Sequence, residues 1–301
     1  MNFVLSIPFV AVYKAWVNCC LAQFGDKKTI NDLAGDLKDG VVFCQLIKLT
    51  TGYEIAQCQQ VNNVPQTHQA VQINDVPQTH HAVQVNDVPQ THQAVQCVID
   101  YMKGKGIDLC CQVEDVTSGK LKFILDILWL IILHFEIHSA KYNVTPADRV
   151  NAAVNAPSNC GQVSLLWTCY WRLSKKQFTS TGYRAAYQRT VNLGKRFLLE
   201  WCCTEIPNTA IDPRGPFLDF LQDGVLLTKL ITKYCPVDGI SPSKFTDKDS
   251  FLKVLKAAED RLGIPRKILS SSGILDDNTF DEYAVIIYMA VLRRMVKRDS
   301  N

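Results

Sequence analysis

The stretch that decides the fold is residues 121–137, which read LKFILDILWLIILHFEI. Apolar side chains recur there at helical spacing and also fill the positions between, so the predicted helix has no polar face. Such a helix lies at the centre of a core or keeps an apolar face for a partner. The stretch is only about 17 residues long and contains Lys122, Asp126 and Glu136, which disfavours a membrane span. We therefore predict a buried helix.

The pattern around this helix occurs a second time. Each half of the chain has an Asp-Gly-Val start to an apolar helix, then a helix that stops at Gly-Ile, then a long apolar helix. We interpret both Asp-Gly pairs as helix starts rather than catalytic groups. The matching pairs are 39–47 with 223–231, Gly106-Ile107 with Gly263-Ile264, and 121–137 with 280–296. The repetition predicts an all-α protein built from two copies of one helical domain.

A block of short repeats interrupts the first copy. Residues 61–96 read VNNVPQTHQAVQ, INDVPQTHHAVQ and VNDVPQTHQAVQ. Each unit contains a proline and too few apolar side chains to close a core, so we expect a loop or a frayed helix. The last unit runs without a break into residues 97–102, CVIDYM, which predict a helix that belongs to the domain itself.

A basic segment separates the two copies. Residues 139–193 contain seven Lys and Arg residues against Asp148 alone, so this segment carries a charge of +6. Its short apolar run, residues 163–173, is too short to span a bilayer and is typical of a helix docked on a domain. We interpret the segment as a linker.

Several motifs together resemble tandem calponin-homology actin-binding modules, closest to filamin and within the spectrin and α-actinin superfamily. Two motifs resemble the first domain of such modules, namely DLKDG at 36–40 and GKLKFILDILWLIILHF at 119–135. Three motifs resemble the second domain, namely QDG at 222–224, AEDRLGIP at 258–265 and DEYAVIIY at 281–288. The resemblance implies two calponin-homology helical domains joined by a long basic linker. The implied division is domain 1 at 9–138 with the repeat insertion at 61–96, the linker at 139–193, and domain 2 at 194–298.

The resemblance also implies a function, namely a cytoplasmic protein of the actin cytoskeleton that binds filamentous actin. The first domain would give the main filament contact and the second would modulate it. The implied actin-binding residues are Lys120, Lys122 and Trp129 on the long apolar helix, Tyr13, Lys14 and Asn18 on the first helix, and Lys195 and Arg196, which we expect to open the first helix of the second domain. Trp129 would be an aromatic anchor with flanking cations that face an acidic filament. A purely structural role in the core is equally open for the side chains of the long apolar helix. The alternative is a solvated face for Tyr13, Lys14 and Asn18, and a basic solvated turn for Lys195 and Arg196.

Other classes of function are less well supported. A microtubule-associated or signalling adaptor is the main alternative, because calponin-homology domains also occur outside actin binding. The net charge of +3, from 32 basic and 29 acidic residues, disfavours a nucleic-acid binder held by phosphate neutralisation. No phosphate-binding loop, dinucleotide fingerprint or hydrolase motif is present in the sequence, so we expect neither an enzyme nor a cofactor. The oligomeric state stays open.

The histidines and cysteines indicate neither a metal site nor a disulfide framework. His134 and His138 have a zinc-compatible spacing but no evident third ligand, so we expect no metal site. The twelve cysteines include three adjacent pairs and no C-x-x-C motif, which favours reduced and mostly buried thiols.

Overall fold

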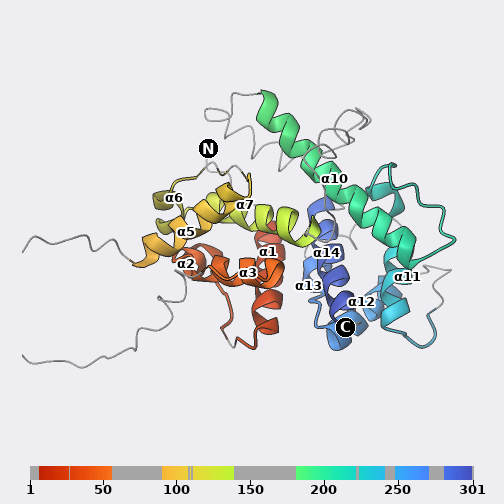
Figure 1. Ribbon diagram of the computed structural model, residues 1–301. Coiled ribbons are helices and arrows are strands. Elements are labelled where there is room, and N and C mark those ends of the chain that lie inside the picture. The colour runs from red at the N-terminus through yellow and green to blue at the C-terminus, as the bar shows by residue number, and fades with distance from the viewer. Residues whose placement is uncertain are drawn as a thin grey trace, which may run out of the picture. The chain divides into compact units, whose positions relative to one another are not determined.

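The computed structural model describes residues 7–26, 28–55, 90–107, 109, 111–138, 181–221, 224–240, 248–270 and 281–299. These residues form helices and turns and contain no β-strand (Figure 1), which confirms the predicted helical class. The first two dodecapeptide units and the apolar run at 163–173 lie outside the described residues.

The chain divides into two compact units. Unit 1 combines Met1–Asn31 with Leu128–Asn301, and unit 2 is Asp32–Ile127. Unit 2 contains α2 (Leu33–Leu37), α3 (Val41–Thr51), α5 (Gln90–Gly104), α6 (Val113–Thr117) and the first part of α7 (Leu121–Ile131). Unit 1 contains α1 (Ile7–Gln23), the end of α7, the π-helix η1 (Ile132–Ile137), α10 (Thr181–Glu205), η2 (Leu218–Phe220), α11 (Val225–Tyr234), α12 (Lys248–Leu262), α13 (Lys267–Ser270) and α14 (Glu282–Asp299).

The two units group residues that lie close together in space, whereas the predicted domains group residues by the repeated sequence pattern. The two divisions therefore do not test each other. The predicted boundaries at 138 and 194 therefore stay a prediction. The last dodecapeptide unit does behave as expected, because α5 begins inside it at Gln90 and continues to Gly104.

The helix starts and stops in both halves follow the sequence signals. The Asp39 side chain accepts a hydrogen bond from the Val41 N–H at 3.0 Å, and Gly40 begins α3 with a φ of 80°. Gly224 begins α11 in the same left-handed conformation, with a φ of 68°, while Asp223 lies outside the described residues. The predicted stops are also confirmed, since α5 and α12 end just before Gly106 and Gly263.

Helix α14 is the central element of unit 1. Its residues from 283 to 293 are all buried, and it packs against α1, α10, α12, α13 and η1. Apolar side chains on every side of a helix require neighbours on every side, which explains this position. The sequence predicted such a helix at 280–296, and the structure places it at Glu282–Asp299.

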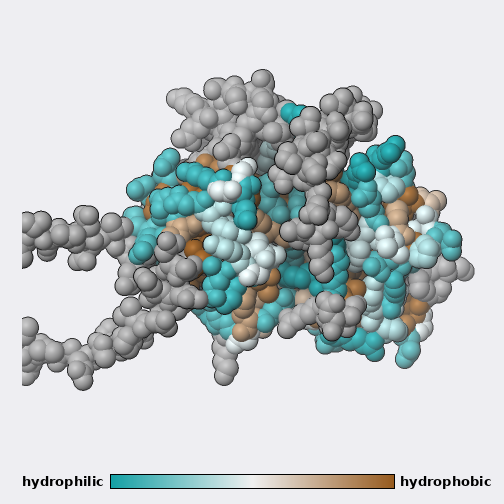
Figure 2. Space-filling model, in the orientation of Figure 1, coloured by the Kyte–Doolittle hydropathy of each residue, from teal (hydrophilic) through white to brown (hydrophobic). Residues whose placement is uncertain are grey.

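The outer surface of the described residues is mixed in character. Hydrophobic residues form small areas between hydrophilic ones on the face in Figure 2. No helix within the described ranges has both the length and the apolar content that a bilayer crossing demands.

The cysteines differ in one respect from the expectation of reduced thiols. Cys44 on α3 is disulfide-bonded, and this corrects the sequence reading. A disulfide depends on the distance between two thiols in the folded chain, which spacing in the sequence does not provide. The free cysteines among the described residues are Cys19, Cys20, Cys97, Cys111, Cys202, Cys203 and Cys235.

Gly40 offers a test of the helix start in unit 2. A Cβ atom at Gly40 would lie 2.7 Å from the Val95 backbone nitrogen, whereas a Cβ at Gly52, which has a similar φ of 72°, meets nothing within 4 Å. We expect Gly52→Ala to cost about 1–2 kcal/mol through backbone strain alone, and Gly40→Ala to cost clearly more because α5 blocks the added methyl group. Chemical denaturation of both variants checks the difference. Equal costs would contradict the close approach of α5 to Gly40.

Candidate functional site

The long apolar helix that decides the fold changes its geometry near its end. It is α-helical to Ile131 and π-helical from Ile132 to Ile137. Short π-helical segments are rare and occur frequently at functional sites. The wider turn of η1 contains Glu136, which is only 8% exposed although it is a carboxylate.

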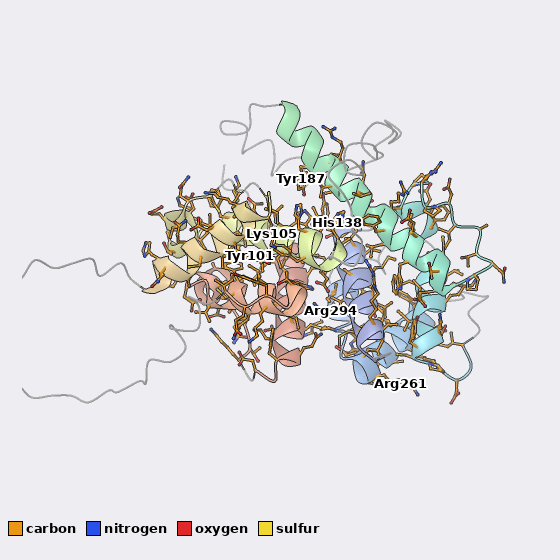
Figure 3. All side chains as sticks on the ribbon, in the orientation of Figure 1. Tyr101, Lys105, His138, Tyr187, Arg261 and Arg294 are labelled. Atoms are coloured by element: carbon orange, nitrogen blue, oxygen red, sulfur yellow. The ribbon has the colours of Figure 1, made fainter. Side chains whose placement is uncertain are left out.

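Glu136 connects three helices of unit 1. The Trp16 Nε1–H on α1 donates a hydrogen bond to Glu136 Oε2 at 2.8 Å. The Arg294 Nη1 atom on α14 lies 2.9 Å from Glu136 Oε1, an ion contact whose angle is unfavourable for a hydrogen bond. Arg294 projects from α14 in Figure 3. An unpaired carboxylate at this depth would cost several kcal/mol, so both partners are needed to keep the charge buried.

The groups around the carboxylate reinforce this contact. Arg293 on α14 donates from Nη1 to the Ile137 carbonyl at 3.1 Å, which ties the same two elements together. Burial raises the pKa of Glu136, while Arg294, Trp16 and Arg293 act in the opposite direction. Burial likewise raises the pKa of the neighbouring Cys19 thiol to about 11, so it stays protonated and is a poor nucleophile at neutral pH.

The predicted exposure of Trp129 is wrong. Trp129 is 1% exposed and packs edge-on against the Tyr283 ring of α14, with centroids 4.8 Å apart. The physical reason is that this helix is apolar all round, so an adjacent helix covers the side that we expected to face solvent. Trp129 is therefore part of the core in this structure, and its contact with a filament stays a prediction.

The predicted residues of α1 are also less available than expected. Tyr13 is fully buried, and Lys14 is partly exposed. The Asn18 side chain donates to the Ile30 carbonyl at 3.0 Å and accepts from the Ile30 N–H at 2.7 Å, so it fixes the segment after α1. Trp16 on the same helix is fully buried and belongs to the core.

Lys120 and Lys122 lie at the start of α7 in unit 2 and keep the predicted accessibility. Lys120 is exposed and forms an ion pair with Asp115 at 2.6 Å, with 58% of its side chain accessible. That contact lowers the pKa of the Asp115 carboxyl. Lys122 is partly exposed, with its Nζ 5.2 Å from the Phe123 ring centroid. These two ammonium groups are the predicted site residues best placed to meet an acidic partner.

The prediction that Lys195 and Arg196 open a helix is wrong. Helix α10 begins at Thr181, so both residues lie well inside it. Lys195 pairs with Glu282 of α14 at 2.7 Å and is largely buried, while Arg196 pairs with Glu200 at 2.7 Å and is more exposed. Lys195 thus helps hold α10 to α14, and Arg196 is the more accessible of the two.

The sequence reading missed the residues that organise unit 1. In the sequence, Glu136 stands out only as a charge that disfavours a membrane span, and no motif marks Arg293 or Arg294. A single carboxylate within an apolar helix was the available signal, because a buried charge requires a partner. The spacing of residues along the sequence does not identify Arg294 as the cation that pairs with Glu136.

The two histidines at the end of this helix, His134 and His138, contact each other and α10. The rings of His134 and His138 are 6.2 Å apart, and His138 Nε2 lies 3.0 Å from the Thr190 carbonyl on α10. Groups of three or more potential metal ligands are absent from the part of the chain that the structure describes.

Comparison with known protein families identifies one domain. Residues 11–137 match the calponin homology (CH) domain. The chain therefore contains a calponin homology domain, which accounts for the motifs at 36–40 and 119–135. The match covers all of unit 2 together with most of α1 and the end of the long helix in unit 1.

Similarity to individual proteins extends further along the chain. The chain is 23% identical to Nesprin-2 of Mus musculus and 21% identical to Nuclear anchorage protein 1 of Caenorhabditis elegans, over 92% and 94% of its length. It is 24% identical to Microtubule-actin cross-linking factor 1 of Mus musculus over 92% of its length. The matched region spans only 4%, 4% and 3% of these proteins, respectively.

The buried ion contact gives a test with a defined pH dependence. Arg294→Met leaves the Glu136 carboxylate buried without its cation, and we expect it to destabilise the chain by about 3–5 kcal/mol at neutral pH. Burial raises the folded-state pKa of Glu136, and loss of Arg294 raises it further. The contribution of Glu136 to stability is therefore lost as the pH rises, so the deficit should be larger at about pH 8 than at about pH 5.

The matched control is the double variant Glu136→Gln/Arg294→Met, which has no buried charge at this contact. It should recover most of the lost stability and lose the pH dependence that Glu136 causes. Urea denaturation across the pH range measures both variants. An Arg294→Met deficit that is the same at both pH values would contradict the role assigned to Glu136.

Proposed function

We propose that this chain binds filamentous actin through its calponin homology domain and acts as a non-enzymatic cytoskeletal protein. The observation that carries the proposal is the calponin homology match over residues 11–137, within which Lys120 and Lys122 remain accessible. One relative is named as a cross-linker of microtubules and actin. Two accessible cations beside an apolar helix suit an acidic protein surface.

We further propose that the second half is another calponin homology domain, as in filamin-like tandem modules. The matches to relatives over more than nine tenths of the chain support this, as do the shared helix starts at Gly40 and Gly224. A cytoplasmic location on the actin cytoskeleton follows from the proposed function.

Co-sedimentation of the whole chain with actin filaments, and separately with microtubules, tests the proposed function. We expect the chain to pellet with actin filaments in a saturable manner and to stay in the supernatant with microtubules. Pelleting with microtubules alone would favour the alternative of a microtubule-associated adaptor, for which the name of the same relative gives some support. Absence from both pellets would overturn the proposal.

Charge reversal at the start of α7 tests the proposed contact. Lys120→Glu/Lys122→Glu should weaken filament binding about tenfold, equivalent to ~1.4 kcal/mol, with little effect on the thermal midpoint because both residues are at the surface. The matched control is Lys253→Glu/Lys256→Glu on α12, where both lysines are exposed and Lys256 pairs with Asp260. Unchanged binding by the first variant, or equal loss in both, would refute this placement of the site.

We also propose that the second half restrains binding through α14, because α14 covers Trp129 and holds Glu136. The double variant Glu136→Gln/Arg294→Met removes the ionic part of that contact. It should raise apparent filament affinity a few-fold if the free chain favours a covered, weakly binding state. A titration of filaments against the parent and the double variant measures this, and an unchanged or reduced affinity would argue against restraint.

A further inference from the structure

A stacked pair of tyrosines, one exposed and one partly buried, lies on unit 2 at residues to which no role is assigned above. Tyr53, which follows α3, is 54% exposed. Its ring stacks on that of Tyr101 from α5, with centroids 5.0 Å apart and planes inclined by 17°. Among the described residues the only other large apolar side chain of comparable exposure is Phe24, at 39%. Exposed tyrosines held in place are typical of contact surfaces.

The backbone on both sides of the pair is fixed. Helix α3 ends at Gly52, whose N–H donates to the Lys48 carbonyl at 2.8 Å, and the Tyr53 N–H donates to the Thr51 hydroxyl at 3.0 Å. After Tyr53 the chain returns to the core at Ile55, which is 6% exposed. Tyr53 therefore stands on a short turn anchored at both ends, and little side-chain and loop entropy remains to be lost on binding.

The α5 side of the pair is equally well fixed. Tyr101 lies in the last turns of α5, which closes with a hydrogen bond from the Ile107 N–H to the Met102 carbonyl at 3.0 Å. Met102 and Ile107 are both buried. The Lys105 Nζ lies 5.5 Å from the Tyr101 ring centroid, within the range of a cation–π contact. Tyr101, on α5, and Lys105, in the turn after it, are labelled in Figure 3.

The charges around the rings indicate the kind of partner. Lys105 has no carboxylate partner among the described residues, so its charge is available to a ligand. Lys48 is already neutralised by Glu54 at 2.6 Å. One cation beside the rings, Lys105, is too little positive charge to hold a phosphate backbone, which favours a protein over a single-stranded nucleic acid.

We propose that Tyr53, Tyr101 and Lys105 form a second contact surface for the actin filament, in which Tyr53 covers an apolar side chain of the filament and Lys105 meets one of its carboxylates. This inference rests on the proposed function. An aromatic anchor beside a cation is the composition of an interface hot spot, and an acidic protein face supplies the complementary charge.

The experiment uses four single variants of the whole chain in actin co-sedimentation. Tyr53→Ala should weaken filament binding about tenfold, and Lys105→Glu several-fold. Tyr53→Phe keeps the stacked ring and should bind within about twofold of the parent. Lys103→Glu is the charge-matched control, because Lys103 is exposed on the same helix but two residues from Tyr101, and so on another side of it. Thermal melts of all four verify folding.

Each outcome decides the proposal. Loss of binding by Tyr53→Ala and Lys105→Glu, with Tyr53→Phe and Lys103→Glu unaffected, supports it. If the parent pellets with filaments and Tyr53→Ala binds equally well, the second contact is refuted while the proposed function stands. If Lys103→Glu loses as much binding as Lys105→Glu, the effect is general charge and the surface is refuted. A parent that does not pellet overturns both, and a Tyr53-dependent affinity for a single-stranded oligonucleotide in place of filaments overturns the assignment of the partner.

Discussion

The buried carboxylate of Glu136 is the constraint on which unit 1 depends. A carboxylate that is 8% exposed requires partners, and it finds them in Trp16 of α1 and Arg294 of α14. The ends of the chain are thereby joined to the end of the long apolar helix. Any motion that separates these helices must bring the charge of Glu136, the indole of Trp16 or the guanidinium of Arg294 to water, or leave one of them unpaired.

This constraint decides which surfaces a partner meets. Packing of α14 against the long helix covers Trp129, so the most apolar part of the calponin homology domain is not presented in this structure. The accessible groups of unit 2 that we assign to partner contact are polar or amphipathic, namely Lys120, Lys122 and the Tyr53–Tyr101 pair. Under the proposed function, an acidic filament would meet these charged and aromatic groups first, and the covered apolar helix would contribute only after a change in packing.

Local features of the fold were predictable from the sequence, and long-range pairings were not. Asp39 and Gly40 begin α3, and Gly106 follows the end of α5, because cap and turn chemistry depends on near neighbours. The contact between Trp16 and Glu136 joins residues 120 positions apart, and periodicity carries no information at that distance. The same limit explains why the burial of Trp129 was not predicted, since the sequence of a helix that is apolar all round does not reveal which of its sides a neighbouring helix covers.

The central claim is that α1 belongs with α14 in one unit held by the buried carboxylate. Native-state hydrogen exchange tests it most directly, because amides of one cooperative unit exchange with a common opening free energy. The account predicts that amides around Trp16 share the opening free energy and denaturant dependence of those around Arg294, and differ from those of α3. Amides of α1 that open with α3, while α14 stays protected, would contradict it.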